Sequence, residues 1–533
     1  MDSDKLSREV TPEIIKELED AIGKDNVNTN GEELLLYTHD LAPLPKMAGL
    51  AFDCVPDAVV RPSKVEDVAA VMKIAYRHGI AVVPRGASTW GMGGCMPVAG
   101  GIVLDMSSKM NKVIEINTED MYVKVQAGIT WKEVLDAVME KGFIIGSYPS
   151  SFPAATVGAW MNTNGMGVGS YKYGSAKDNV RNLQVVLPDG TVIETGYDQM
   201  NSNMTGYNLN QFFAGSEGTL GVIATATMTI YPMGIVRPIA YEFETMQAMH
   251  PAIQALVRHP SIIPYHISWA DSSHFAHQFQ AGEHIPEGMK NILLVTLQGA
   301  QKNVEFEEAE LDEIMASFNG VKKDDSVGEH EWEERCYEFR ARRVGVGEIP
   351  AEVLIPVKHW GEFVEECVRG FDVMKMEMGG QVGNIVDRST ALFMPYYFKD
   401  DESMLGMTAF AYNFYMGDRA AAYGGRNTGL GVFFAWNLDI YHDADTVEFM
   451  RELKTFVDPH DVMNPGHVVC GQTRFGVNLS HGLMSFASEL MQTVKRLLPE
   501  NTTFQDNIER FRYNQLEEEK AADRKHVLGR GYD

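Results

Sequence analysis

Apolar residues in the first part of the chain alternate between the spacing of amphipathic helices and that of buried strands. Residues 11–23 begin with Thr-Pro and carry apolar side chains every three or four positions up to a glycine, which predicts a short helix. The run AVVRP at 58–62 predicts a buried strand. The next helix has Ser63 and Glu66 in the spacing of a capping box and Gly79 where a helix commonly ends.

Strands and helices continue to alternate after this helix. IAVVP at 80–84, GIVLDM at 101–106 and MYVKVQAG at 121–128 read as strands. Residues 131–142 have helical spacing and end at a glycine. QVVLPDGTVIET at 184–195 is typical of a β-hairpin with Pro-Asp-Gly as its turn. Together these elements predict an α+β domain.

Three segments rich in small residues interrupt this pattern, at 84–97, 149–167 and 215–223. The first places four glycines within eleven positions. Glycine permits positive φ and has no Cβ, so such a segment can bring backbone N–H groups close to an anion such as a phosphate. A high density of glycine is, by itself, equally typical of an ordinary loop without a ligand. The second segment is too long to be a mere connection, and long ordered loops inside a domain are usually functional.

The pattern of apolar and charged residues changes near residue 236. From there on, longer charged helical segments alternate with strands such as NILLVTLQG. Near residue 450, RELKTFVDPHDVMNPGHVV reads as a helix, a turn and a segment ended by Pro-Gly. Residues 476–533 contain one amphipathic segment followed by a charged tail. Such a tail is typical of a solvated arm, or of an arm that binds a neighbouring subunit. We divide the chain into an N-terminal helix and lead-in (1–54), a first domain (55–235), a second domain (236–450), a segment that returns to the first domain (451–475) and a C-terminal helical arm (476–533).

Composition narrows the classes of function. The chain has 533 residues, of which 45% are hydrophobic and 22% charged, which is typical of a globular protein with two or more cores. Its net charge of −27 opposes phosphate backbones, so we expect no nucleic-acid partner. An acidic N-terminus, with no apolar stretch of about 18 residues, predicts neither export nor a membrane span. We therefore expect a cytoplasmic protein.

Candidate metal ligands are sparse in the sequence. Five cysteines are scattered without CxxC spacing, which suits a reducing compartment, and we expect mostly buried thiols. His266, His274 and His277 lie close together in the sequence, but the pair His274 and His277 lacks a nearby third ligand in an obvious geometry. We therefore interpret them as surface histidines and expect no metal site. The Rossmann dinucleotide fingerprint, the P-loop and HExxH are all absent.

The three small-residue segments and their flanking strands together resemble a known cofactor domain. DAVVRPSKVEDVAAVMKIAYRHGIAVVPRG, PAATVGAWMNTNGMG, the pair Tyr173-Gly174, VVLPDG and GSEGTLGVI occur in the order typical of the FAD-binding domain of the vanillyl alcohol oxidase/p-cresol methylhydroxylase superfamily. They look most like its FAD-linked oxidase branch, which includes glycolate oxidase and D-lactate dehydrogenase. The resemblance covers roughly residues 55–235 and the stretch FVDPHDVMNPG at 456–466.

The resemblance implies an α+β fold, with a two-lobed FAD-binding domain of the p-cresol methylhydroxylase (PCMH) type and an α+β, ferredoxin-like cap domain over the reactive face of the flavin. FAD is the implied cofactor. Residues 84–91 and 150–165 would supply backbone donors to the pyrophosphate and isoalloxazine, whereas residues 217–223 would lie toward the ribose and adenine. Arg85 can supply a counter-charge, or else form a surface salt bridge. The implied cofactor-binding residues are Pro84, Arg85, Gly86, Ala87, Ser88, Thr89, Trp90, Gly91, Ser150, Ser151, Thr156, Val157, Gly158, Asn162, Gly165, Glu217, Gly221 and Ile223.

The second domain departs from the hydroxy-acid branch of this superfamily. That branch carries H-x-G-D-G-N-x-H and E-H-G-I-G elements, whose His and Glu groups hold a metal or handle the substrate hydroxyl. The corresponding regions here read QVGNIVDRS (381–389) and GGRNTGLGV (424–432), without those histidines. A metal-assisted hydroxy-acid mechanism is therefore not expected.

The layout of DRSTALFMPYYFKDD and YGGRNTGLGVFFAW is similar instead to the phenol-oxidising branch, in which a Tyr and an Arg grip a phenolate. A phenol becomes a good hydride donor at its benzylic carbon when deprotonated, and a neighbouring Arg lowers the pKa of the phenol. The tyrosines of MPYYF can equally be packed aromatic residues of a strand. The candidates for this role are Arg388, Tyr396, Tyr397, Tyr423 and Arg426.

One segment favours the other substrate class. Residues 332–356 resemble the hydroxy-acid branch, in which an Arg at the position of Arg340 binds the substrate carboxylate. Arg342 and Arg343 are alternatives. Three arginines in four positions are also typical of a solvated helix face.

These features predict an FAD-dependent oxidoreductase that passes hydride to flavin N5. The first candidate substrate is a small, phenolic or benzylic alcohol or an alkylphenol, and the alternative is a D-2-hydroxy acid such as lactate or glycolate. A non-catalytic flavin subunit of an electron-transfer assembly is a further alternative. We expect a homo-oligomer. The sequence leaves open whether the acceptor is O2, a quinone or an electron-transfer protein, and whether FAD is covalently attached.

Overall fold

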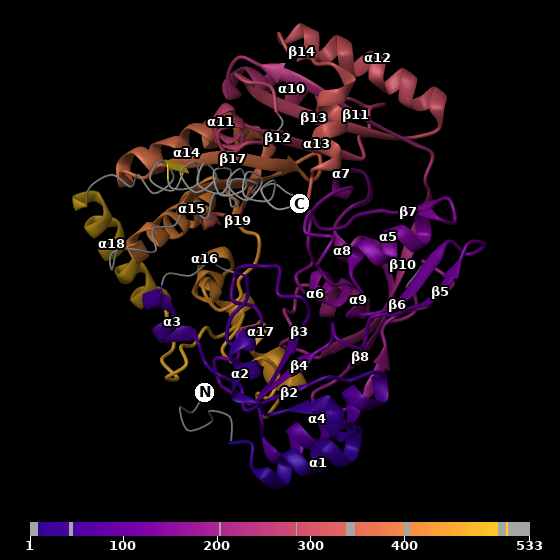
Figure 1. The fold of residues 1–533 in the computed structure, drawn as a ribbon, viewed down its shortest axis with the longest axis vertical. Helices are drawn as coiled ribbons and strands as arrows, with labels where there is room; N and C mark the ends of the chain where they lie inside the picture. The colour runs from indigo at the N-terminus through magenta and orange to yellow at the C-terminus, as the bar shows by residue number, and fades with distance from the viewer. Residues whose placement is uncertain are drawn as a thin grey trace, which may run out of the picture.

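The computed structural model describes residues 9–41, 46–201, 204–283, 285–336, 347–398, 406–498 and 508–509. Helices and strands are mixed around three β-sheets, which confirms the predicted α+β class (Figure 1). The chain runs from the two sheets at the bottom and right of the view to the third sheet at the top, and then returns to the bottom.

The first sheet has the strand order β1-β2-β4-β3, and β2, β4 and β3 are parallel. Helix α1 (Pro12–Ile22) begins at Thr11, whose hydroxyl accepts a hydrogen bond from the N–H of Ile14, and it packs on α4 (Val65–His78). Apolar side chains of both helices and of the sheet form one core, as their spacing predicts. The other elements of this region are η1 (Lys24–Asn26), β1 (Val27–Asn28), α2 (Gly31–Leu34), η2 (Leu35–Tyr37), α3 (Lys46–Phe52), β2 (Ala58–Val60), β3 (Val82–Arg85) and β4 (Ile102–Asp105).

The start of α4 differs from the prediction. The carboxylate of Asp67 accepts hydrogen bonds from the N–H of Ser63 at 2.9 Å and from its hydroxyl at 2.8 Å. The capping box with Glu66 is therefore wrong, because the helix starts one residue later, after Lys64, and turns Asp67 toward Ser63. Gly79 ends the helix with a φ of 66°, as predicted.

The second sheet is antiparallel, with the order β5-β6-β10-β8-β9, and β7 pairs with the end of β10. β8 and β9 form the predicted hairpin, with Gly190 at a φ of 83° in its turn. Its strands are β5 (Val113–Asn117), β6 (Tyr122–Gln126), β7 (Phe143–Ile145), β8 (Val180–Val186), β9 (Val192–Glu194) and β10 (Val222–Pro232). The helices of this part are α5 (Trp131–Met139), α6 (Val157–Asn162), α7 (Ser170–Tyr173), α8 (Ala176–Asn179) and α9 (Leu209–Phe213).

The third sheet is also antiparallel, with the order β14-β11-β13-β12-β17-β18-β16-β19 and β15 beside β18. Its side chains alternate between two faces: in β13, Leu293 and Val295 enter the main core, whereas Ile292 and Leu294 enter a smaller cluster on the opposite face. Its strands are β11 (Ile235–Phe243), β12 (His266–Ala270), β13 (Asn291–Gly299), β14 (Val321–Lys322), β15 (Glu348–Pro350), β16 (Val353–Pro356), β17 (Met378–Ile385), β18 (Thr390–Phe398) and β19 (Arg426–Asn427).

Helices cover both faces of the third sheet unequally. The main core joins one face to α10, α12, α14 and α15, while α11 and α13 lie over part of the other face and leave the rest of it free to line a cavity. The bounds of these helices are α10 (Met246–Arg258), α11 (Ser272–Gln280), α12 (Gln301–Ser317), α13 (Asp325–Glu333), α14 (Trp360–Met374) and α15 (Ala411–Ala422), with the turns η4 (Val357–His359) and η5 (Gly406–Phe410).

The chain then returns to the first sheet. Val82 of β3 donates its N–H to the carbonyl oxygen of Val462 at 2.7 Å and accepts from the N–H of Asn464 at 2.9 Å. Residues 462–464 therefore run beside β3 and extend the first sheet by a parallel bridge. The remaining elements are η6 (Ala435–Asn437), α16 (Leu438–Tyr441), α17 (Ala444–Val457) and α18 (His481–Leu497), the last of which packs on α14 and α15.

Cysteine burial and helix polarity bear on two further expectations. Cys367, inside α14, is buried, but the other four cysteines lie in loops and turns and are half-buried. The expectation of mostly buried thiols is therefore wrong.

Within the described ranges, every helix is either too short or too polar to span a bilayer.

Candidate functional site

A cavity of about 1410 Å³ lies between the first two sheets and the third. Its volume exceeds the roughly 300–1,000 Å³ of pockets that bind drug-sized molecules. One wall comes from the small-residue segments, at 84–94, 149–167 and 217–223, and the other from β16, β17, β18 and β19. Three segments that are far apart in the sequence thus meet at one site.

Most residues that the resemblance assigns to FAD line this cavity. Ala87, Val157 and Gly221 do not; Val157 is fully buried in α6, and Gly221 packs against β8. The assigned residues that line the cavity are Pro84, Arg85, Gly86, Ser88, Thr89, Trp90, Gly91, Ser150, Ser151, Thr156, Gly158, Asn162, Gly165, Glu217 and Ile223.

Backbone N–H groups gather at the turn that follows β3. Among the described residues, the N–H groups of 87–91 find no hydrogen-bond acceptor, and Ser88 has a φ of 59°. The buried hydroxyl of Thr156 likewise has no partner within the described chain. A Cβ added to Gly86 would lie 2.2 Å from this hydroxyl oxygen, so the two loops are in close contact. Free donors at a concave turn form a cradle that suits an anion such as a diphosphate.

Arg85 adds positive charge beside this turn. Its guanidinium lies 5.1 Å from the ring centroid of Tyr37 and donates to the carbonyl oxygens of Tyr37 at 3.3 Å and Leu36 at 3.4 Å. The side chain is buried and makes no ion pair with a described residue. The alternative reading, a surface salt bridge, is therefore wrong.

Glu217 connects the two walls of the cavity. Its carboxylate accepts hydrogen bonds from the N–H groups of Leu430 at 3.0 Å and Gly431 at 2.7 Å. Burial raises the pKa of the Glu217 carboxyl to about 7, although these two hydrogen bonds oppose the rise. The carboxylate thus holds the segment that follows β19, in addition to any contact that the resemblance implies with the cofactor.

Strand register builds the opposite wall. Leu354 of β16 lies opposite both Leu392 of β18 and Arg426 of β19, and Leu392 lies opposite Asn384 of β17. Directly opposed residues share one face of a sheet, and all four line the cavity. The row has an amide at one end, a guanidinium at the other and two leucines between them. The amide of Asn384 makes no hydrogen bond with any described residue, although only 5% of Asn384 is exposed.

A second row on the same face contains a carboxylate. Glu352 lies just before β16, and its carboxylate oxygen Oε2 accepts a hydrogen bond from the hydroxyl of Thr428 at 3.1 Å. Met394 of β18 lines the cavity beside it. Burial raises the pKa of the Glu352 carboxyl, and hydrogen bonds from Thr428 and Trp90 offset part of that rise. Sequence reasoning missed Glu352 because a single acid in the run AEVLIP carries no motif.

Two predicted tyrosines lie away from the cavity. Tyr396 and Tyr397 are buried in β18 and are not among the residues that line it. The hydroxyl of Tyr396 lies 2.8 Å from Nδ1 of His274, and that of Tyr397 donates to Oδ1 of Asn413 at 2.8 Å. Both are packed aromatic residues of a strand, which is the alternative that the sequence left open.

The third tyrosine is separated from the arginine near it. Tyr423 packs against His359 and Phe363, with ring centroids 5.3 and 5.6 Å apart, and does not line the cavity. Arg426 does line it and is exposed there. Of the predicted catalytic residues that the structure describes, Arg426 alone faces the cavity.

Arg388 points to a different part of the surface. It donates to the carbonyl oxygens of Val257 at 2.8 Å and His259 at 2.9 Å, at the end of α10. It is exposed and is not among the cavity-lining residues. The predicted carboxylate-binding residues Arg340, Arg342 and Arg343 lie outside the described residues.

The expectation of surface histidines is wrong for His266 and His274, each of which is only 4% exposed. His266 belongs to β12, a central strand of the third sheet, where burial and the charge of Arg335 lower its pKa to about 3. His277 is half-buried, with Nδ1 2.7 Å from the carbonyl oxygen of Gly379. In the described ranges, no three His, Cys, Asp or Glu side chains form a group that could hold a metal ion.

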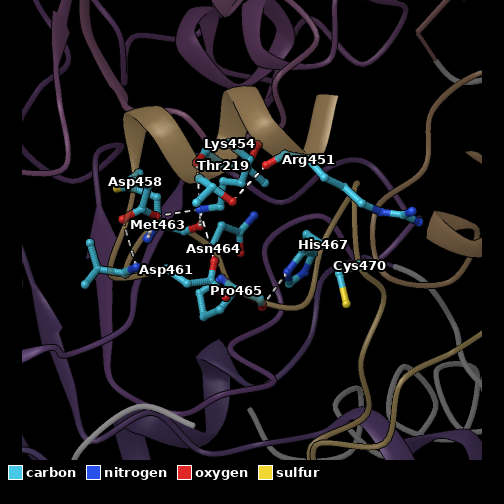
Figure 2. Close-up of polar contacts among 12 residues, drawn as sticks. Thr219, Arg451, Lys454, Asp458, Asp461, Met463, Asn464, Pro465, His467 and Cys470 are labelled. Carbon is cyan, nitrogen blue, oxygen red and sulfur yellow. Dashed lines mark hydrogen bonds and ion pairs between the residues drawn. The ribbon is translucent and has the colours of Figure 1, made fainter. Parts of the chain in front are cut away.

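A buried lysine fixes the returning segment (Figure 2). Lys454 of α17 donates to the carbonyl oxygens of Thr219 at 3.0 Å and Met463 at 2.9 Å. Its ammonium also pairs with the carboxylates of Asp458 and Asp461. The charge is thus compensated inside the protein.

The same segment touches the loops of the first wall. Asn464 donates from Nδ2 to the carbonyl oxygens of Gly94 at 2.9 Å and Glu217 at 2.8 Å. Nε2 of His467 lies 2.9 Å from the carbonyl oxygen of Gly93. The returning segment therefore supports two of the three cavity loops from behind.

Two family matches cover most of the chain. Residues 56–196 match the FAD binding domain family, and residues 236–468 match the C-terminal domain of FAD linked oxidases. The first range contains the turn after β3 and the loop before α6. The second range contains the wall built by β16 to β19.

Curated relatives are similar over most of their length. The glycolate oxidase subunit GlcD of Bacillus subtilis is 27% identical over 87% of this chain and 98% of that protein. A probable mitochondrial D-lactate dehydrogenase of Danio rerio is 26% identical over 78% of this chain and 84% of that protein.

Solved structures share the fold at lower sequence identity. A p-cresol methylhydroxylase with substrate bound has a TM-score of 0.72 at 20% identity, covering 88% of this chain and 97% of that one. A 4-ethylphenol oxidase from Gulosibacter chungangensis, in complex with isoeugenol, has a TM-score of 0.73 at 18% identity, covering 87% and 98%. An alkyldihydroxyacetonephosphate synthase has a TM-score of 0.68 at 21% identity, covering 87% and 88%.

Proposed function

Because this chain belongs to the FAD-linked oxidases of the vanillyl alcohol oxidase/p-cresol methylhydroxylase superfamily, we propose that it oxidises the hydroxyl-bearing carbon of a small anionic alcohol, with a D-2-hydroxy acid as the first candidate. The observation that carries this choice is the cavity wall on which Arg426, two leucines and Asn384 form one row. The similarity to a glycolate oxidase subunit and to a probable D-lactate dehydrogenase supports the same substrate class.

The described residues of the first wall fit FAD. We assign the diphosphate to the free N–H groups of 87–91 and to the hydroxyl of Thr156, with Arg85 as the nearby positive charge. When bound, FAD accepts a hydride and so takes two electrons from the substrate. The close contact of Gly86 with Thr156 leaves room there for backbone donors but for no added side chain.

The second wall gives the substrate its orientation. A guanidinium binds a carboxylate through charge-assisted hydrogen bonds, so Arg426 anchors the acid end of the substrate. Leu354 and Leu392 contact its carbon skeleton, and the free amide of Asn384 can bond a second oxygen. This arrangement favours hydroxy acids that carry an apolar side chain over the smallest ones.

A phenolic or benzylic alcohol is the second candidate. The two leucines and Met394 suit an aromatic ring, and Arg426 can stabilise a phenolate as it would a carboxylate. It ranks second because Tyr396, Tyr397 and Tyr423 lie away from the cavity, which leaves the arginine without a tyrosine partner among the described candidates. Location in the cytoplasm and a homo-oligomer stay predictions of the sequence, which leaves the electron acceptor open.

The test is anaerobic reduction of the purified flavoprotein. D-lactate, a D-2-hydroxy acid with a longer alkyl chain, 4-hydroxybenzyl alcohol and an alkylphenol are added separately, and bleaching of the flavin absorbance is followed. Bleaching by the hydroxy acids, faster for the longer chain, is the expected result. Bleaching by the phenols alone would replace the first candidate by the second. A bound flavin that none of the four compounds reduces would favour the non-catalytic flavin subunit.

A further inference from the structure

Glu352 occupies a distinctive position on the cavity wall. It precedes β16, so that its carboxylate lies in the row next to Leu354 and Arg426 on the face that lines the cavity. The side chain is half-buried, and its exposed part faces the cavity. No motif marks this residue, and the sequence alone gives it no role.

Thr428 holds the carboxylate in place from the neighbouring segment. Its N–H donates to the carbonyl oxygen of Glu352 at 3.4 Å, and its hydroxyl donates to Oε2 at 3.1 Å. Backbone and side chain of the two residues are therefore paired, although they are 76 positions apart. A carboxylate oriented in this way has little freedom to turn away from the cavity.

Two other acids of the cavity, Asp40 and Glu217, have different tasks. Asp40 accepts a hydrogen bond from the N–H of Gly93 at 2.7 Å, and Glu217 accepts from two N–H groups beyond β19. Each of these carboxylates fixes a loop. Among the described residues that line the cavity there is no histidine, so the commonest proton acceptor of enzymes is missing from this part of the site.

We propose that Glu352 accepts the hydroxyl proton of the substrate while the adjacent carbon is oxidised. The inference rests on the proposed function. The C–H bond breaks and its two electrons pass with the hydrogen to the bound flavin, the O–H bond breaks and its proton passes to Glu352, and the carbon–oxygen double bond forms. No metal ion is needed for this step, because the carboxylate supplies the base and Arg426 supplies the positive charge.

The surroundings of Glu352 set the pH at which it can act. The other charged groups that line the described part of the same cavity are Asp40, Arg85, Lys177, Glu217, Glu334 and Arg426. Burial raises the pKa of Glu352, against the hydrogen bonds of Thr428 and Trp90. Because the base works as the carboxylate, the rate of flavin reduction should rise with pH through this elevated pKa and then level off.

The experiment compares wild type with Glu352→Gln, which keeps the size of the side chain and an oxygen that Thr428 can bond. Anaerobic reduction by the best of the four compounds is measured from acidic to alkaline pH, together with FAD content and the substrate dissociation constant from the flavin spectrum. We expect reduction to slow by about 100- to 10,000-fold and its pH dependence to flatten, with FAD content unchanged and substrate affinity altered by no more than a few-fold.

Two further variants keep the test decisive. Glu352→Ala should recover part of its rate when formate or acetate is added, and exposed Glu365→Gln on α14 should behave as wild type. Infrared spectra taken across the same pH range should contain a neutral-carboxyl band in wild type that Glu352→Gln lacks, and this readout does not depend on turnover. If Glu352→Gln fails to fold, the formate or acetate experiment with Glu352→Ala tests the proposal. Recovery of the rate of flavin reduction supports Glu352 as the proton acceptor, and no recovery contradicts it.

The outcomes separate the two proposals. Wild-type bleaching with an unchanged rate and pH profile in Glu352→Gln would overturn the role of Glu352 and leave the proposed function intact. Loss of the pH dependence in Glu334→Gln, another acid that lines the cavity, but not in Glu352→Gln would assign the proton to Glu334 instead. Absence of bleaching in wild type with every hydroxy compound would overturn both.

Discussion

Nζ of Lys454 lies 3.0 Å from the carbonyl oxygen of Thr219, although 235 positions separate the two residues in the sequence. The contact ties α17 to the loop that precedes β10 and lines the cavity. Asp458 and Asp461 balance the charge of the ammonium. The geometry of a cavity loop therefore depends on a segment near the other end of the chain.

Replacing Lys454 by methionine should destabilise the protein by about 3–5 kcal/mol, because it leaves buried carboxylate and carbonyl groups without their partner. Chemical unfolding of the purified flavoprotein measures the change, and FAD content should fall with it. The matched control is Lys16→Met on α1, which removes an exposed Lys–Asp pair of the same spacing and should leave the stability almost unchanged. An equal loss of stability in the two variants would show that the buried Lys454 ion pair stabilises the fold no more than an exposed pair does.

Gly86→Ala should reduce FAD binding. The added Cβ would lie 2.2 Å from Oγ1 of Thr156 and 2.9 Å from Cβ of Ala159, so one of the two loops must move at the turn assigned to the diphosphate. We expect a destabilisation of about 1–3 kcal/mol and a lower flavin-to-protein ratio in the purified protein. Gly482→Ala in α18 is the control, since its Cβ would meet no atom within 4 Å and alanine favours a helix. A full complement of FAD in Gly86→Ala would speak against the assigned diphosphate site.

Glu217 should make stability depend on pH. Burial raises its pKa from 4.5 to about 7, so between these values the folded protein binds a proton that the unfolded chain has lost. Its contribution to stability is therefore complete below pH 4.5 and is lost as the pH rises toward 7, by up to about 3 kcal/mol.

Glu217→Gln removes this titration. The free energy of unfolding of the variant minus that of wild type should therefore increase from pH 5 to pH 8, which means that the variant gains stability relative to wild type, and urea unfolding at both pH values measures it. Exposed Glu365→Gln should show no such trend. A constant difference between Glu217→Gln and wild type at the two pH values would contradict the shifted pKa.

Arg426→Met should weaken binding of the anionic substrate. A charge-assisted hydrogen bond to a carboxylate is worth about 1.5–3 kcal/mol, so KM should rise by about 10- to 100-fold while the flavin spectrum stays the same. Steady-state kinetics with D-2-hydroxy acids measure the change. Arg258→Met, on the exposed side of α10, should leave KM unaltered. An unchanged KM in Arg426→Met would remove the anchoring role.

Local patterns were sufficient for the parts of the fold that local forces determine. The Thr-Pro start of α1, the turn at Gly190 and the glycines near 84–94 follow from backbone preferences of single residues, and each lies in the predicted kind of element. Ser63 shows the limit of this reasoning. A shift of one residue in the helix start was enough to replace Glu66 by Asp67 as its partner.

Side-chain direction and strand position could not be predicted in the same way. His266 is buried because β12 lies in the middle of the third sheet, a position that depends on pairing with β13 and β17. Glu352 faces the cavity because of its pairing with Thr428, and the sequence near either residue does not encode that register. Tyr396 and Arg426 were both candidates for binding the substrate, yet of these two only Arg426 lines the cavity.

The pairing of β3 with residues 462–464 also concerns the order in which the chain is made. While the ribosome synthesises the third sheet, Val82 lacks the partners that later occupy its N–H and carbonyl oxygen, so one side of the first sheet is an open edge. Open strand edges pair readily with other chains. A nascent or truncated chain that stops before residue 462 should therefore be prone to aggregate and to need chaperones, even though its first two sheets are already synthesised.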